Sequence, residues 1–148
     1  MKASELMTAQ PVSCSPGDSI QDAAKLMDAY DVGSLPVVEG GDNTRLTGIV
    51  TDRDITVRAV AIGRFDARVA DVMTGNPSTV GKDDDVDTVA RIMAEEQVRR
   101  IPVVDERGAV IGMIAQADLA LHDDVVSDRT VGRVVERISE RAPGVASS

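Results

Sequence analysis

The sequence contains an internal repeat, and this feature constrains the fold more than any other. Three blocks of residues each occur twice: Leu6–Ser13 and Val72–Thr79, Leu35–Val38 and Ile101–Val104, and Gly48–Ile55 and Gly112–Leu119. The offset is 66 residues for the first two pairs and 64 for the third, with the difference falling in a turn. A repeat of this length is one supersecondary unit, and such units usually pack together to complete a core.

Each repeat is expected to contain the elements β-α-β-β-α in that order. A short extended segment precedes a helix whose apolar residues begin at Ile20 in the first repeat and at Val86 in the second. Two β-rich runs separated by turn residues then predict a hairpin, and a second helix follows. The expected hairpin strands are Ser34–Val38 with Leu46–Val50 and Arg100–Val104 with Val110–Ile114, and the expected second helices run from Asp52 to about Ile62 and from Gln116 to about Leu121.

This order of elements predicts an α+β fold in which the helices of each repeat cover one face of a small sheet. The two repeats, residues 1–65 and 66–122, are expected to pack their sheets together with pseudo-two-fold symmetry. A short helix is expected to lead into each repeat, near Glu5–Met7 and near Asp71–Met73. Residues 123–148 are expected to form a C-terminal helix and a frayed tail.

Composition and charge exclude several classes of partner. Only Tyr30 and Phe65 are aromatic, so the core must be aliphatic and the usual stacking platform for single-stranded nucleic acid is missing. The formal net charge of −9 repels phosphate backbones, which argues against nucleic-acid binding. No apolar run reaches membrane-spanning length and the first residues carry no apolar signal stretch, so we expect a cytoplasmic protein with no membrane partner.

The sequence carries no familiar catalytic or metal-binding motif. Gly-x-Ser-x-Gly, the P-loop and His-Glu-x-x-His are all missing, so we expect no catalytic residue and no enzyme activity. Cys14 is the only cysteine, and we interpret it as a packed thiol beside the first crevice rather than a redox sensor. His122 is followed by Asp123 and Asp124, but this spacing matches no known ligand set, so we expect no metal site.

The hairpin of the first repeat carries a distinctive pattern. It consists of Val32–Val38 (VGSLPVV) followed by Gly48–Asp54 (GIVTDRD). This pattern resembles the cystathionine-β-synthase (CBS) domain, and the duplication resembles a CBS pair, or Bateman module, over nearly the whole chain. Thr51–Ile55 (TDRDI) and Gln97–Val103 (QVRRIPV) also resemble the stand-alone actinobacterial CBS pairs of the hypoxic-response type.

The resemblance implies that an adenine nucleotide binds in a crevice of the first repeat. Thr51 stands where a strand meets a helix, and its hydroxyl with the first helical N–H groups would hold the phosphate. Asp54 can accept hydrogen bonds from two ribose hydroxyls, and the small pair Gly33–Ser34 would let the base approach the backbone. Aliphatic side chains would sandwich the base. The full expected ligand set is Val12, Cys14, Val32, Gly33, Ser34, Leu35, Pro36, Thr51, Arg53 and Asp54.

Thr51 and Asp54 can also be interpreted without a bound ligand. Thr51 and Asp54 also form a plain capping box, which satisfies helix N–H groups on its own. The two readings are compatible, because a phosphate can displace a cap.

The second repeat departs from the pattern of the first. Ala115 replaces the hydroxyl residue although Asp118 remains, and Arg99–Arg100 replace the small pair. Three interpretations stay open: the arginine stems fill the second crevice, the arginine heads neutralise a phosphate in the first crevice or across a dimer, or both arginines are solvated. Arg53 carries the same ambiguity. We therefore treat Arg99, Arg100 and Asp118 as secondary candidates.

These observations lead to two hypotheses from different classes. The first is a non-enzymatic regulatory module that binds an adenine nucleotide and passes its occupancy to a downstream protein that the sequence does not name. AMP is the leading ligand, followed by ADP, ATP and S-adenosylmethionine, and no further cofactor is required. The alternative is a dimeric stress or interaction protein that binds no nucleotide. A homodimer is expected because each small sheet covers only part of the aliphatic helix surface.

Overall fold

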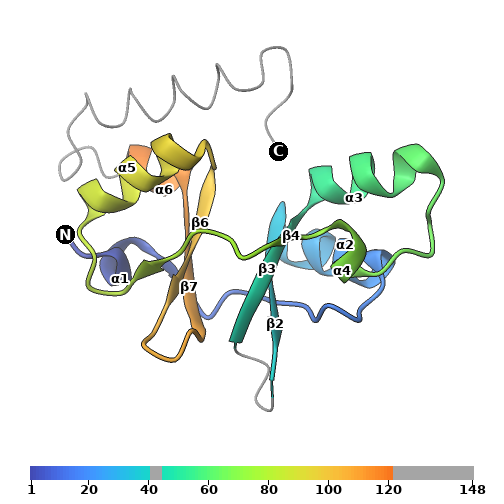
Figure 1. The fold of residues 1–148 in the computed structure, drawn as a ribbon. Coiled ribbons are helices and arrows are strands. Elements are labelled where there is room, and N and C mark those ends of the chain that lie inside the picture. Colours follow the sequence, from blue (N-terminus) through green and yellow to red (C-terminus); the bar gives the residue numbers. More distant parts are fainter. Residues whose placement is uncertain (41–44, 122–148) are drawn as a thin grey trace. The chain divides into compact units, whose positions relative to one another are not determined.

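The computed structural model describes residues 1–40 and 45–121, which form two compact units (Figure 1). Unit 1 contains residues 1–10, 78–106 and 111–121, and unit 2 contains residues 11–40, 45–77 and 107–110. His122 and the helix and tail expected over residues 123–148 lie outside the described residues. The mixture of helices and two small sheets confirms the predicted α+β class.

Unit 2 is built on a hairpin of β2 (Ser34–Glu39) and β3 (Arg45–Thr51). The two strands are antiparallel, with Leu35 opposite Val50. A third short strand, β4 (Thr74–Gly75), pairs with the other edge of β3, so the strand order is β2-β3-β4. The predicted hairpin of the first repeat is therefore confirmed.

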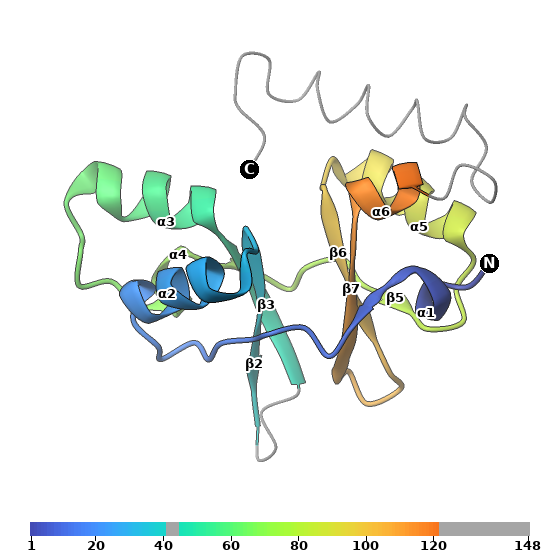
Figure 2. The same ribbon diagram turned by 180° about the vertical axis from the view of Figure 1, so that it is seen from behind.

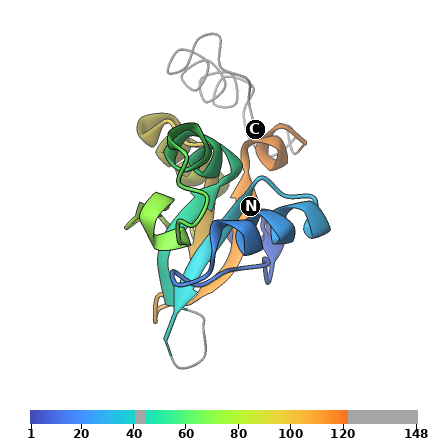
Figure 3. The same cartoon turned by 90° about the vertical axis from the view of Figure 1, so that its right-hand side faces the viewer.

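Three helices cover one face of this hairpin, and Figure 3 shows them in front of its strands. They are α2 (Ile20–Tyr30), α3 (Asp52–Arg58) and α4 (Val69–Val72). Side chains of all three helices share one buried cluster with the strand residues Leu35, Val37 and Val50. Leu35 and Val37 are two positions apart on β2 and Val50 lies opposite Leu35, so these three side chains point to the same face of the sheet.

The second helix of the first repeat is shorter than the sequence suggested. α3 ends at Arg58, because Ala59 leaves the helical region with φ −126° and ψ −64°. A 3₁₀ turn, η1 (Val60–Ile62), continues the segment to the predicted end. The expectation of helical structure to about Ile62 is thus met by two pieces rather than one.

Unit 1 repeats this plan with the elements of the second repeat. Its sheet has the order β1-β7-β6-β5, in which β7 and β6 are the predicted hairpin strands. Figure 2 shows its helices on one side of β7, and they share a buried aliphatic cluster with the strands. The elements are α1 (Ala3–Leu6), β1 (Thr8–Ala9), β5 (Val80–Gly81), α5 (Val86–Glu96), β6 (Arg100–Val104), β7 (Val110–Ala115) and α6 (Gln116–Leu121).

The short segments that lead into the two repeats are exchanged between the units. α1 and β1 open the first repeat in the sequence, yet β1 pairs with β7 of the second repeat. Likewise α4 and β4 open the second repeat, yet β4 pairs with β3 of the first. Each sheet is therefore completed by residues that belong, in sequence, to the other repeat.

Backbone geometry confirms that the two repeats are locally equivalent. Non-glycine residues with positive φ occur in pairs 66 positions apart: Gln10 and Asn76 (both 49°), and Asp31 (53°) and Gln97 (55°). Asp31 and Gln97 end α2 and α5 in the left-handed conformation that often terminates helices. The lead-in helices are held alike, since Ala3 N–H donates to Asp84 O at 2.8 Å and Val69 N–H to Asp18 O at 2.8 Å.

One glycine in each hairpin allows the exchanged segment to approach closely. A Cβ atom at Gly48 would lie 2.8 Å from both the Met73 sulfur and the Thr74 carbonyl oxygen. A Cβ atom at Gly112, the equivalent glycine, would overlap the side chain of Met7. These contacts place the methionine of each lead-in segment directly over a strand of the sheet that it completes.

Candidate functional site

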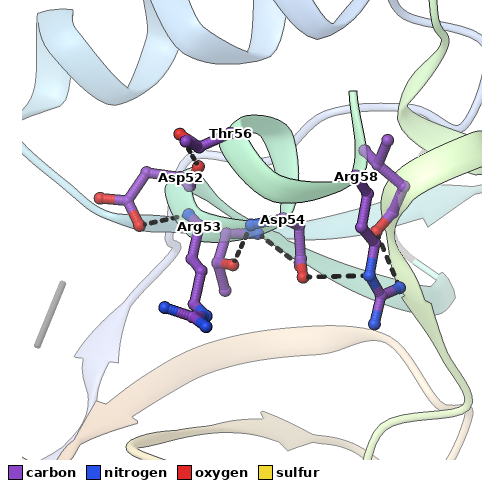
Figure 4. A network of polar contacts seen from close by, with 7 residues as sticks. Asp52, Arg53, Asp54, Thr56 and Arg58 are labelled. Atoms are coloured by element: carbon purple, nitrogen blue, oxygen red, sulfur yellow. Dashed lines mark hydrogen bonds and ion pairs between the residues drawn. The ribbon is translucent and has the colours of Figure 1, made fainter. Parts of the chain in front are cut away.

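The predicted ligand residues Thr51 and Asp54 lie together where β3 ends and α3 begins. Figure 4 shows Asp54 at the start of α3. The Thr51 hydroxyl accepts a hydrogen bond from the Asp54 N–H at 3.0 Å. In return, Asp54 Oδ2 accepts a hydrogen bond from the Thr51 N–H at 3.0 Å. These two bonds form a complete capping box, so the structure shows the cap that the sequence suggested.

The second carboxylate oxygen of Asp54 faces a cation. Arg58, one helical turn further along α3, places Nε 3.8 Å from Asp54 Oδ1. The same guanidinium donates from Nη1 to the carbonyl oxygen of Val72 at 3.2 Å. Only 15% of the Asp54 side chain is exposed, so the carboxylate is well protected from water yet remains accessible.

The first N–H groups of α3 already have acceptors within the protein. Asp52 N–H donates to Gly33 O at 2.9 Å, and Arg53 N–H donates to the Asp52 carboxylate at 2.8 Å. The next N–H group, that of Asp54, is bound by the Thr51 hydroxyl. A phosphate at this helix start would therefore have to displace the Thr51 hydroxyl or the Asp52 carboxylate.

The bond from Asp52 to Gly33 brings the small pair beside the polar residues. Gly33 is half-buried and Ser34 is 8% exposed, while Val32 keeps 38% of its surface exposed. The backbone at Gly33–Ser34 is thus held next to the start of α3. Contact of this backbone with a nucleotide base stays a prediction.

The other predicted ligand residues differ in how accessible they are. Leu35 is 0% exposed and its side chain belongs to the buried cluster of unit 2, so only its backbone is available to a ligand. Pro36 is also buried, and Val12 is partly buried against the same cluster. Arg53 is exposed, and Figure 4 shows its side chain extending away from Asp54. Ligand contact by these residues stays a prediction.

Cys14 is a buried thiol with little nucleophilic character. It forms a parallel bridge to Val37 at the edge of β2, and its thiol lies 4.0 Å from the Pro36 carbonyl oxygen, to which it donates. Burial raises the pKa of the Cys14 thiol to about 12, and the negative charge of Asp18 adds to the rise. Because the thiolate is the reactive form, this environment favours the packed thiol over the redox sensor.

The second repeat reproduces only half of the polar arrangement. Asp118 Oδ2 accepts from the Ala115 N–H at 2.8 Å, as Asp54 does from Thr51, but alanine offers no hydroxyl in return. Arg99 takes the place of Gly33, since its carbonyl oxygen accepts from the Gln116 N–H at 2.7 Å. Arg99 and Arg100 are both partly buried in unit 1. A role for either in phosphate binding stays a prediction.

Sequence reasoning missed Arg58 and the carbonyl group of Gly33. A signal for the first was present, because an acidic residue four positions before an arginine on a helix predicts an ion pair. The second had no signal in the sequence, since a backbone acceptor depends on how β2 and α3 meet. Both groups restrict what a ligand can reach at this site.

The chain belongs to the CBS domain family, whose model matches residues 3–60 and 69–123. The two matches correspond to the two repeats, so the chain carries a CBS pair. The predicted resemblance is confirmed.

Relatives support this assignment over most of the chain. The CBS domain-containing protein YhcV of Bacillus subtilis is 35% identical over 143 residues, covering 93% of this chain and 94% of that protein. Hypoxic response protein 1 of Mycobacterium tuberculosis is 31% identical over 122 residues, covering 81% and 83%. The resemblance to proteins of the hypoxic-response type is therefore confirmed at the level of sequence.

Solved structures with the same fold include proteins with bound ligands. The structure of CBSX2 in complex with AMP aligns with a TM-score of 0.70 and 28% identity over 81% of this chain and 93% of that one. The CBS pair of protein MJ0100, in complex with 5′-methylthioadenosine and S-adenosylmethionine, gives 0.72 and 27% over 82% and 94%. CBS pairs related to this chain thus bind adenine-containing ligands.

A third structure, of Hypoxic Response Protein I with two coordinated zinc ions, aligns with a TM-score of 0.73 and 31% identity over 82% of this chain and 98% of that one. Within residues 1–40 and 45–121, no group of three or more His, Cys, Asp or Glu residues could hold a metal ion.

In the same part of the chain, no helix is long and apolar enough to cross a membrane.

Proposed function

We propose that this protein is a non-enzymatic regulatory module that senses an adenine nucleotide, AMP foremost, through the Thr51–Asp54 site of unit 2. One observation carries the proposal: a hydroxyl, a protected carboxylate and the small pair Gly33–Ser34 are held together by the bonds described above. The second repeat lacks both the hydroxyl and the small pair. The ligands bound by CBSX2 and MJ0100 add support from related CBS pairs.

The proposed binding mode requires a local exchange of hydrogen bonds. The ribose hydroxyls would donate to the Asp54 carboxylate, and the phosphate would accept from N–H groups at the start of α3 in place of a protein side chain. Because the cap returns when the ligand leaves, the empty site is not left with unsatisfied N–H groups. The exchange therefore gives the site two stable arrangements, which is what a sensor needs.

Titration calorimetry with AMP, ADP, ATP and S-adenosylmethionine tests this proposal. AMP has roughly 23 non-hydrogen atoms, and ~0.3 kcal/mol per atom gives about 7 kcal/mol, or a dissociation constant on the order of 10 μM. One AMP per chain is expected. If none of the four ligands binds at millimolar concentration, the sensor function is rejected in favour of the interaction protein.

We further propose that the protein forms a homodimer through the outer surface of α3 and the segment after it. Four apolar side chains are exposed there: Val57 (48%), Val60 (46%), Ile62 (65%) and Phe65 (70%). Contiguous exposed apolar side chains commonly mark association surfaces, and a two-fold dimer is the commonest closed assembly.

The substitution Ile62→Asp is expected to convert the dimer to a monomer, since it places a charge on this apolar surface. Light scattering at micromolar concentration should give twice the chain mass of 15.6 kDa for the unmodified protein and one chain mass for the variant. Gln21→Asp, at an exposed position on α2, serves as a control and should remain dimeric. A monomeric unmodified protein, or a dimeric Ile62→Asp variant, would refute the proposed surface.

A further inference from the structure

Arg58 connects two parts of unit 2 that are distant in sequence. One edge of its guanidinium, at Nε, faces Asp54 Oδ1 at 3.8 Å. Another nitrogen, Nη1, donates to the Val72 carbonyl oxygen at 3.2 Å. Because the guanidinium is a rigid planar group, a shift that changes one of these contacts changes the other.

The Val72 carbonyl lies at a sensitive point of the chain. Val72 is the last residue of α4, where carbonyl groups have no partner within the helix. The next residues form β4, which pairs through Thr74 and Gly75 with β3. This α4–β4 segment is the stretch of chain that leads from the first repeat into the second.

We propose that Arg58 is a positioning residue that couples Asp54 to the α4–β4 segment. In the state shown, the Asp54 carboxylate helps to hold the guanidinium against Val72. Ligand hydroxyls that donate to Oδ1 compete with Arg58, and the guanidinium then supports the end of α4 less well. The coupling between Asp54 and the segment rests on the geometry alone, whereas its use by a nucleotide rests on the proposed function.

Coupling free energies are reciprocal, so a change at Asp54 must affect the α4–β4 segment if the two are linked. A substitution at Asp54 can supply that change, and the link can therefore be measured without any ligand. Asp54→Asn removes the charge that faces Arg58 but keeps an oxygen to accept from the Thr51 N–H. Arg58→Ala removes the link itself at a side chain that is 53% exposed, so the variant is expected to fold. These two substitutions and their combination form a double-mutant cycle.

The readout is amide hydrogen exchange by NMR in the α4–β4 segment. Met73 N–H donates to Val69 O at 2.9 Å and Asn76 N–H to Thr47 O at 3.4 Å, so both amides report on this segment. Each single substitution is expected to speed their exchange about threefold to fivefold, the effect of a partly exposed ion pair. The double variant should exchange no faster than the singles. The Gln116 amide of unit 1 serves as the reference for any general loss of stability.

Arg64→Ala is the matched control. Arg64 also contacts α4, with its guanidinium 3.7 Å from Asp71, but the structure gives it no contact with Asp54. Asp54→Asn should therefore have its full effect in the Arg64→Ala background. If the effects of Asp54→Asn and Arg58→Ala on the exchange rates multiply in the double variant, the coupling is overturned. It is also overturned if neither single variant changes the exchange of the Met73 and Asn76 amides.

A second arm uses saturating AMP. AMP is expected to speed exchange at Met73 and Asn76 several-fold relative to other amides of unit 2, and to lose this effect in Arg58→Ala protein that still binds it. Binding without a change at these amides, or the same change in Arg58→Ala, would overturn the regulatory role of Arg58. Failure of AMP to bind at all would instead reject the proposed function, and the ligand-free cycle would still decide the coupling.

Discussion

Gly48→Ala and Gly112→Ala are each expected to lower the free energy of unfolding by about 1–3 kcal/mol, the usual cost of forcing an extra methyl group into a packed site. A Cβ atom at Gly48 would stand 2.8 Å from the carbonyl oxygen of Thr74, which cannot rotate away because β4 pairs with β3 there. At Gly112 the added methyl group would lie 2.9 Å from the Cβ atom of Met7, so rotation of the Met7 side chain cannot relieve the contact and the backbone at Met7 must also shift.

Thermal or urea unfolding measures this effect, and two glycines provide controls. Gly75 stands opposite Gly48 in the strand pair, and a Cβ atom there would meet nothing within 4 Å. Gly17 likewise has open space. Gly75→Ala and Gly17→Ala should unfold within about 0.5 kcal/mol of the unmodified protein. Equal losses at Gly48 and Gly75 would show that the close approach of Met73 and Thr74 is not what the glycine permits.

Asp54→Ala and Thr51→Ala are each expected to weaken AMP binding by roughly 10- to 100-fold. The estimate follows from about 1.5–3 kcal/mol for a hydrogen bond to a charged group. Thr51→Ala also removes half of the capping box, at a cost of about 1 kcal/mol in stability. Calorimetry must therefore be carried out at a temperature where the variants remain folded.

Asp118→Ala is the matched control for this prediction. Asp118 accepts from the Ala115 N–H at 2.8 Å, as Asp54 accepts from the Thr51 N–H at 3.0 Å. The two substitutions therefore remove the same kind of helix cap, one in each repeat. If Asp118→Ala weakens AMP binding as much as Asp54→Ala does, the assignment of a single site to the first repeat is wrong.

The elements with a clear residue pattern could be predicted from the sequence. The hairpin strands and helices of both repeats were recognised because aliphatic residues recur at strand or helix spacing over five or more positions. The capping box at Thr51 can also be predicted, because its two residues, Thr51 and Asp54, are only three positions apart in the sequence. What these predictions have in common is that the stabilising contacts are local.

The exchanged segments could not be predicted because their partners are distant. β1 and β4 each have only two residues, too few to show a period of two. Thr8 pairs with Met113, and the sequence gives no sign of which edge it joins. The repeated methionines and glycines were visible in the aligned blocks, but their contacts depend on which sheet each lead-in segment completes.

The candidate site shows the same division between local and distant contacts. Thr51 and Asp54 were found from their spacing, and the structure shows them bonded to each other. The acceptor at Gly33 and the link from Arg58 to Val72 were not found, because each joins elements that meet only in the folded unit. Those longer contacts determine how a ligand would change the protein.

The exchange of lead-in segments also sets an order of assembly during synthesis. Synthesis has passed every helix and strand of unit 2 once it reaches Pro77. The ribosome therefore releases these elements before most of unit 1. Residues 1–10 leave the ribosome before unit 2, yet β1 finds its partner only after β7 has been made. Domains tend to fold as they emerge from the ribosome. In this chain the candidate ligand site would form early, and residues 1–10, although made before it, would find their place only after β7.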